Sequence, residues 1–249
     1  MSKLRILYVA TEINPFLQTT KVADFLRMLP QAMQERGMEI RIFVPRFGLI
    51  NERKNRLHEV VRLSGINIAV GEEEKPLVIK VASIPNAKLQ VYFIDNDERA
   101  IFFCKGVLET VKKLGWSPDI VHCYDWMTGL IPMYLKTTYK KDPIFKDAKS
   151  VFTVCNNEFS HKFEGDLLEK VKMLDIEDSM LGHLKSADYD GFVKVGMEYA
   201  DTVIKSDEDF SDNMNALFTE FKLTKTINEI EQNEDQLDSY YNLYNELAN

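Results

Sequence analysis

The first 48 residues follow a pattern that strongly limits the fold. Residues 5–10 form a short apolar run typical of a buried parallel strand. Residues 24–36 have the spacing of an amphipathic helix that ends at Gly37, and residues 40–44 form a second apolar run. This order predicts a strand–helix–strand unit, a unit whose ligands bind at the turn between the first strand and the helix.

The turn of this predicted unit contains no glycine. Residues 11–22 have Gln18, Thr19, Thr20 and Lys21 at their centre. A backbone that cradles phosphate approaches its ligand closely, often with positive φ, and glycine does this most easily. Thr20 is β-branched and Lys21 is bulky, so neither suits that role. The turn therefore has the position of a phosphate-binding loop without its usual residues.

The rest of the chain alternates between predicted strands and helices. Short runs at residues 59–70, 77–82 and 89–94 predict an antiparallel hairpin or meander inserted in the sheet. Further strands are expected at residues 119–123, 150–155 and 202–204, and helices at 97–114, 128–139, 192–199 and 208–221, the first of them capped by Asn96 or Asp97. Such alternation predicts an α/β domain with a mainly parallel sheet.

The last segment has its own pattern. Residues 226–249 carry apolar and aromatic residues largely at helical spacing, which predicts a helix that docks on the domain or on a partner. We therefore expect a single domain over residues 1–249, a Rossmann-like three-layer sandwich with this helix packed back on it.

Composition argues against several classes of partner. The net charge of −8 argues against nucleic acid and anionic membranes. No 18-residue apolar run exists, and the N-terminal apolar run is too short for a signal peptide, so we expect a cytoplasmic protein. Three cysteines fit a reducing compartment. The four histidines show no metal-ligand spacing with these cysteines, so no metal site is expected.

The segment WSPDIVHCYDWMTGLIPMYLK occupies residues 116–136, and further motifs lie in segments 6–16, 23–48, 95–109, 151–156 and 193–210. Together these segments resemble the N-terminal half of bacterial glycogen synthases and plant starch synthases. The resemblance covers roughly residues 1–215. It implies the GT-B fold of retaining glycosyltransferases that use ADP-glucose in glycogen or starch biosynthesis and consist of two facing Rossmann-like halves.

The departures from this family lie where its chemistry is expected. The family turn has a lysine, a threonine and two glycines, whereas this chain has Gln18 to Lys21. The family has histidines on both sides of an Asp-Trp pair, here Asp125-Trp126, and this chain has Tyr124 and Met127 instead. A family histidine before Asn156 is replaced by Cys155. Because one lost transition-state donor costs about 10²–10³ in rate, catalysis of the family type is not expected.

The residues left at these positions define a residual sugar or phosphate pocket. Two of them have an alternative structural role: Glu12 can brace the turn, and Asp125 can act as an acid or base or cap the following helix. No cofactor is expected. The candidate pocket residues are Glu12, Gln18, Thr19, Thr20, Lys21, Tyr124, Asp125, Trp126, Cys155 and Asn156.

The length of the chain suggests loss of the second half. The residues after Phe210 are too few for another Rossmann half, yet residues 237–249 resemble the terminal helix of these synthases, which packs back on the first half. Chance similarity is the alternative, since amphipathic aromatic helices are common.

Three hypotheses on function follow. The leading hypothesis is a non-catalytic relative, a pseudoenzyme that binds glucan or a protein partner. The alternative is a glycosyltransferase that is active only with a partner supplying the nucleotide-binding half. The third is a homodimer through the face left by the missing half, near which Met127, Phe159 and Phe163 are expected. Weak binding of ADP-glucose is compatible with the first two.

Overall fold

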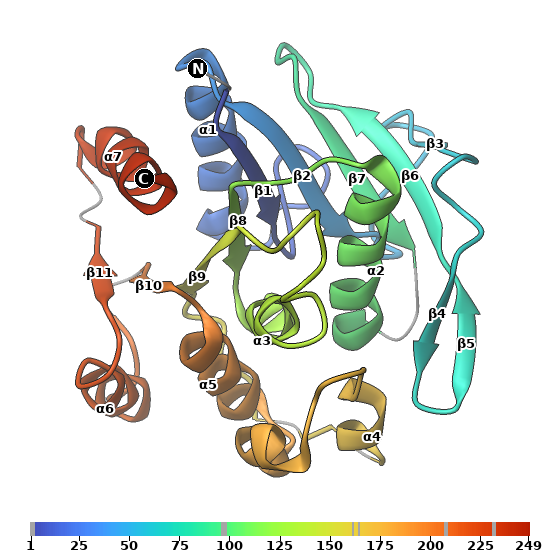
Figure 1. Cartoon of the computed structure of the whole chain (residues 1–249). Coiled ribbons are helices and arrows are strands. Elements are labelled where there is room, and N and C mark those ends of the chain that lie inside the picture. Colours follow the sequence, from blue (N-terminus) through green and yellow to red (C-terminus); the bar gives the residue numbers. More distant parts are fainter. Residues whose placement is uncertain (1–2, 96–98, 161, 164, 207–208, 231–232) are drawn as a thin grey trace.

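A computed structural model describes residues 3–95, 99–160, 162–163, 165–206, 209–230 and 233–249. Its main sheet has nine strands in the order β11-β10-β9-β8-β1-β2-β7-β6-β3 (Figure 1). Neighbours from β11 to β7 pair in parallel. These parallel strands are β1 (Arg5–Val9), β2 (Glu39–Pro45), β7 (Gln90–Asp95), β8 (Ile120–Tyr124), β9 (Lys149–Val154), β10 (Thr202–Lys205) and β11 (Ile227–Glu229).

The antiparallel insertion occupies the other side of the sheet. Strand β6 (Val78–Ser83) pairs antiparallel with β7, and β3 (His58–Glu59) pairs antiparallel with β6. A separate hairpin consists of β4 (Asn67–Val70) and β5 (Glu73–Pro76). The predicted run at residues 59–70 is thus not one strand. A turn at Val60 and Leu63 and the positive φ of Gly65, +83°, separate β3 from β4.

Helices cover both faces of the sheet (Figure 1). On one face lie α1 (Lys21–Glu35) and α7 (Gln236–Ala248), and on the other lie α2 (Arg99–Leu114), α3 (Leu130–Lys136) and α5 (Tyr189–Tyr199). The core on the side of α2, α3 and α5 also includes residues of α4 (Leu167–Val171), α6 (Asp212–Phe221) and two 3₁₀ segments, η1 (Trp126–Thr128) and η2 (Asp178–Ser186). The predicted three-layer, Rossmann-like α/β fold is confirmed.

The two cores follow from alternation along buried strands. In β1, Ile6 and Tyr8 belong to the core beneath α1 and α7, whereas Leu7 and Val9 belong to the core beneath α2 and α3. Successive side chains of a strand point to opposite faces, so a continuous apolar run supplies both layers at once.

Some predicted boundaries were wrong. Helix α1 begins at Lys21 rather than residue 24, because Thr20 caps it by accepting a hydrogen bond from the Val22 amide at 3.1 Å. The helix expected at residues 128–139 is shorter, because α3 spans Leu130–Lys136 and Thr128 belongs to η1. The predicted cap at Asn96 or Asp97 lies outside the described residues.

The C-terminal segment is part strand and part helix. Ile227–Glu229 form β11, because the Val203 amide donates to the Thr226 carbonyl at 3.2 Å and extends the parallel ladder. Helix α7 begins at Gln236 and lies beside α1 (Figure 1). It buries Tyr240 and Tyr244, and Arg36 of the α1 C-terminus bonds Asp238 at 2.5 Å.

A buried histidine anchors this helix to the sheet. The His122 ring in β8 bonds the Tyr244 hydroxyl and the Thr153 hydroxyl, both at 2.7 Å. Burial lowers the pKa of His122 well below its ordinary value, so the ring is neutral. Each ring nitrogen therefore has a hydroxyl partner, and α7 is joined to the centre of the sheet.

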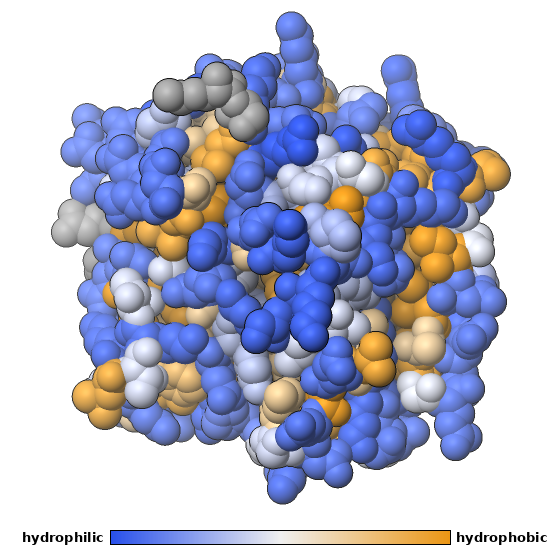
Figure 2. Space-filling model, in the orientation of Figure 1, coloured by the Kyte–Doolittle hydropathy of each residue, from blue (hydrophilic) through white to orange (hydrophobic). Residues whose placement is uncertain are grey.

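The surface is mostly polar on the side that Figure 2 shows, with apolar residues scattered between hydrophilic ones. Among the described residues, no helix combines the length and apolar character that crossing a membrane requires.

Candidate functional site

The candidate residues follow the carboxyl ends of neighbouring parallel strands. Glu12 comes after β1, Asp125 directly follows β8, and Cys155 directly follows β9. Because parallel strands end at one edge, the fold brings these loops together where open α/β sheets bind ligands. The N-terminus of α1 lies at the same edge, because β1 leads into it.

Glu12 is buried and holds the glycine-free turn. Its carboxylate accepts from the Thr19 amide and the Thr19 hydroxyl, both at 2.6 Å, and from the Thr20 amide at 3.0 Å. The Thr20 hydroxyl donates to the same carboxylate. The two amides precede α1, where the helix dipole favours an anion. In this chain the anion is the protein's own side chain.

The polar residues around the turn are directed to structural partners. Gln18 is exposed and its amide donates to the Asp24 carboxylate at 2.7 Å, and Asn14 donates to the other oxygen of Asp24 at 2.6 Å. Lys21 belongs to the first turn of α1 and lines a small cavity. The turn is therefore closed by internal hydrogen bonds on both sides.

Asp125 occupies a strained position. Its φ of +72° and ψ of 163° fall in a region that glycine usually occupies. Its carboxylate accepts from the Trp126 amide at 2.7 Å, which caps η1, and from the Asn157 side chain at 2.8 Å. Burial raises the pKa of Asp125 to about 6, and the nearby Glu12 charge contributes. Its contacts match the capping alternative.

Tyr124 and Cys155 are buried beside the cavity that Lys21 lines. This cavity has a volume of about 120 Å³, and Tyr240 of α7 closes one side of it. Tyr124 lines the cavity together with Tyr240, and burial raises the pKa of Tyr124 well above its ordinary value. The cavity is therefore bordered by neutral tyrosine side chains, with Lys21 at its edge.

The structure does not bring every candidate residue into this cavity. Trp126 packs against Phe159, Phe163 and Phe192, with ring centroids 4.8 to 5.7 Å apart. Asn156 is exposed and donates to the Asp209 carbonyl at 2.6 Å. Of the ten candidate residues, Lys21, Tyr124 and Cys155 line the cavity, and the other seven do not.

Met127, which was expected near the face left by the missing half, is 3% exposed and belongs to the core.

The sequence patterns do not predict several neighbours of the candidate residues. Asn157 donates to Asp125, Tyr189 donates to the Cys155 carbonyl at 2.8 Å, and Tyr240 closes the cavity. The i, i+4 spacing of Tyr240 and Tyr244 signals burial but not the surface on which they pack. Within the described ranges, no group of three His, Cys, Asp or Glu side chains could hold a metal ion.

Comparisons with a family model and with curated proteins both match this chain to starch or glycogen synthases. A family model described as the starch synthase catalytic domain matches residues 5–229. The chain is 34% identical over 232 residues to the glycogen synthase of Chlorobium limicola and 38% identical over 220 residues to that of Chlorobium luteolum. These matches cover 84% and 79% of this chain but 47% and 44% of the relatives. The chain thus spans about half the length of the curated relatives it matches.

A solved structure shares the fold. The catalytic domain of starch synthase IV from Arabidopsis thaliana, bound to ADP and acarbose, matches with a TM-score of 0.72 at 16% identity. The match covers 91% of this chain and 51% of that one. Together with the family model, these similarities show that the chain belongs to the starch synthase catalytic domain family.

Proposed function

We propose that this chain is a glycogen or starch synthase-type domain that does not transfer glucose by itself and acts in binding, either to a glucan or to a protein partner. The observation that carries this proposal is the Glu12 carboxylate on the Thr19 and Thr20 amides. A diphosphate at the same amides would displace that carboxylate or lie against its negative charge. Either event opposes binding of a sugar nucleotide.

The size of the cavity supports the same proposal. Pockets for small organic ligands usually measure about 300–1,000 Å³. The cavity at the carboxyl edge has about 120 Å³, and Lys21 is the one cationic residue among its described lining residues. A sugar nucleotide is too large for this space unless α7 moves.

Two measurements test the proposal. Glucosyl transfer from ADP-glucose to glycogen is measured with the pure chain, with the Chlorobium limicola glycogen synthase as positive control. We expect no turnover, and measurable turnover by the pure chain would overturn the proposal. Calorimetric titration with ADP-glucose and with maltooligosaccharides then separates the ligands. We expect no saturable heat with ADP-glucose; saturation by maltooligosaccharides supports glucan binding, and silence with both favours a protein partner.

A second candidate function is a glycosyltransferase completed by another polypeptide. Its support is the identity of the relatives, which are glycogen synthases, and the exposed Lys21 beside the cavity. It predicts that adding the C-terminal half of the Chlorobium limicola enzyme produces turnover that neither part has alone. A Lys21→Gln variant should weaken that turnover, and an Arg62→Gln variant, which changes an exposed charge elsewhere, should not.

A partner covering the carboxyl edge could also be a second copy of the chain. Sedimentation velocity over a range of concentrations distinguishes this from a different partner. A concentration-dependent dimer supports self-association, whereas a monomer throughout the range excludes it.

A further inference from the structure

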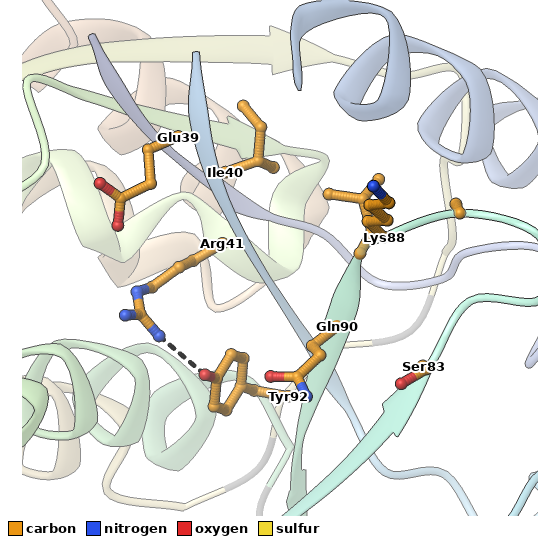
Figure 3. A pocket seen from close by; sticks show the side chains of 9 residues that line it. Glu39, Ile40, Arg41, Ser83, Lys88, Gln90 and Tyr92 are labelled. Carbon is orange, nitrogen blue, oxygen red and sulfur yellow. Dashed lines mark hydrogen bonds between the residues drawn. The ribbon is translucent and has the colours of Figure 1, made fainter. Parts of the chain in front are cut away.

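A second pocket lies at the opposite edge of the sheet, where β2 and β7 begin and β6 ends (Figure 3). Its volume is about 380 Å³, which lies within the range of pockets that hold small organic ligands. This pocket lies at the amino ends of the parallel strands β2 and β7, which we call the amino edge. The length of the strands separates it from the candidate loops at the carboxyl edge. It is not explained by the function proposed above.

Three polar side chains form a row across this edge. Ser83 of β6 is paired with Gln90 of β7, and the pairing of Ile42 with Val91 places Arg41 of β2 opposite Gln90. Directly opposite residues share a face, and neighbouring strands lie about 4.8 Å apart. The row thus presents a guanidinium, a carboxamide and a hydroxyl side by side, and each of these groups can donate hydrogen bonds.

The Arg41 guanidinium is held in place but is not neutralised. Its Nη1 donates to the Tyr92 hydroxyl at 2.7 Å (Figure 3). The guanidinium carbon lies 5.0 Å from the Trp116 ring centroid. Its Nε is buried without a hydrogen-bond partner. No carboxylate of the described residues lies within ion-pair distance of Arg41. Stacking fixes the plane of the guanidinium and leaves its charge unpaired.

The other charges at the pocket leave it positive. Glu39 is the one carboxylate among the described lining residues, and it is engaged by Arg5 at 3.4 Å and by the Trp116 indole N–H at 2.6 Å. Lys88 adds a second cation and is exposed. Figure 3 shows the Lys88 side chain away from Arg41, so it attracts an anion without sharing its contact. The positive lining contrasts with the net charge of −8.

We propose that this pocket binds a small molecule through its phosphate or carboxylate group. Arg41 makes the main contact, because a fixed guanidinium suits the planar arrangement of oxyanion acceptors. Gln90 and Ser83 donate to the remaining acceptors of the same molecule. The volume leaves space for a body larger than the anionic group alone.

Nuclear magnetic resonance tests this site with two simple probes, inorganic phosphate and citrate. The chain has two tryptophans, and the Trp116 indole N–H lies beneath Arg41 whereas Trp126 lies at the other edge of the sheet. We expect the Trp116 indole resonance to shift in a saturable manner with at least one probe. The Trp126 resonance should not shift, and chloride at equal ionic strength should have no such effect. Saturation by phosphate alone or citrate alone identifies the anionic group.

Variants then establish which side chain is responsible. Arg41→Gln should weaken binding at least about tenfold, since it removes a charge-assisted contact. Arg41→Lys keeps the positive charge but loses the planar guanidinium, so it should retain part of the affinity and separates the effect of the charge from that of the plane. Arg62→Gln removes an exposed charge elsewhere and serves as the matched control. The absence of a saturable shift with both probes, or equal affinity in Arg41→Gln, would overturn the proposal.

Discussion

Glu12 shows how one buried side chain can fix the conformation of a turn. Four donors from Thr19 and Thr20 converge on its buried carboxylate, so the turn depends on this residue for its shape. The sequence could place Glu12 after the first strand, but it could not distinguish a ligand contact from a brace. That distinction depends on the direction of two amides, which residue types alone do not specify.

Replacing Glu12 should therefore cost stability. We expect Glu12→Gln to lower the free energy of unfolding by about 2 kcal/mol, because charge-assisted bonds become neutral and one acceptor becomes a donor facing amides. Urea denaturation measures the change. Glu220→Gln, an exposed change on α6, should stay within about 0.5 kcal/mol. A Glu12→Gln variant as stable as the native chain would contradict the bracing role.

Asp125 should make stability depend on pH. Its folded pKa is raised to about 6, so between pH 4 and 6 the folded state binds more protons than the unfolded state. The stabilising contribution is present below pH 4 and is lost as pH rises through 6, by about 3 kcal/mol at most. From pH 4 to 7, the free energy of unfolding of the native chain should fall relative to that of the Asp125→Asn variant by up to about 3 kcal/mol, as measured by urea denaturation at each pH. A constant difference would show that Asp125 titrates normally.

At the scale of elements, strand and helix types followed from short patterns, whereas their ends depended on tertiary contacts. The apolar runs of β1 and β8 could be assigned because buried parallel strands need continuous hydrophobicity on both faces. The start of α1 depended on the Thr20 cap, and the strand at Ile227 depended on an edge offered by β10. The spacing of apolar residues in the sequence predicts neither the Thr20 cap nor the pairing with β10.

Helix α7 is the element most open to test. Tyr244→Ala removes a buried ring and leaves one nitrogen of His122 without its partner, so we expect a loss of about 3–5 kcal/mol and release of the helix. Hydrogen exchange should show lost protection in α7 with smaller change in α6. Asn242→Ala, an exposed change on the same helix, should retain protection. Equal protection in Tyr244→Ala would mean that other contacts hold the helix.

At the scale of the whole molecule, charge limits the range of partners. The chain has 31 basic and 39 acidic residues, and the positive pocket at the amino edge is a local exception. The three layers could be predicted from strand–helix alternation, but this pocket could not. Its row of Arg41, Gln90 and Ser83 comes from three strands whose register the sequence does not state.

The overall charge predicts weak interaction with polyanions. We expect the chain to pass through a heparin column without retention at physiological salt, because long-range repulsion outweighs one local pocket. A basic protein of similar size serves as the retained control. Retention that falls steeply with added salt would reveal a cationic surface larger than the pocket described here.

The contact between α7 and the middle of the sheet has a consequence for biogenesis. His122 and Tyr244 are joined across more than a hundred residues of sequence, and Tyr8 and Tyr124 lie in the same buried group. On the ribosome, these aromatic rings stay uncovered until translation has passed residue 244. Because nascent domains fold from the N-terminus and exposed apolar surface invites aggregation, this interval is when the chain most needs a chaperone.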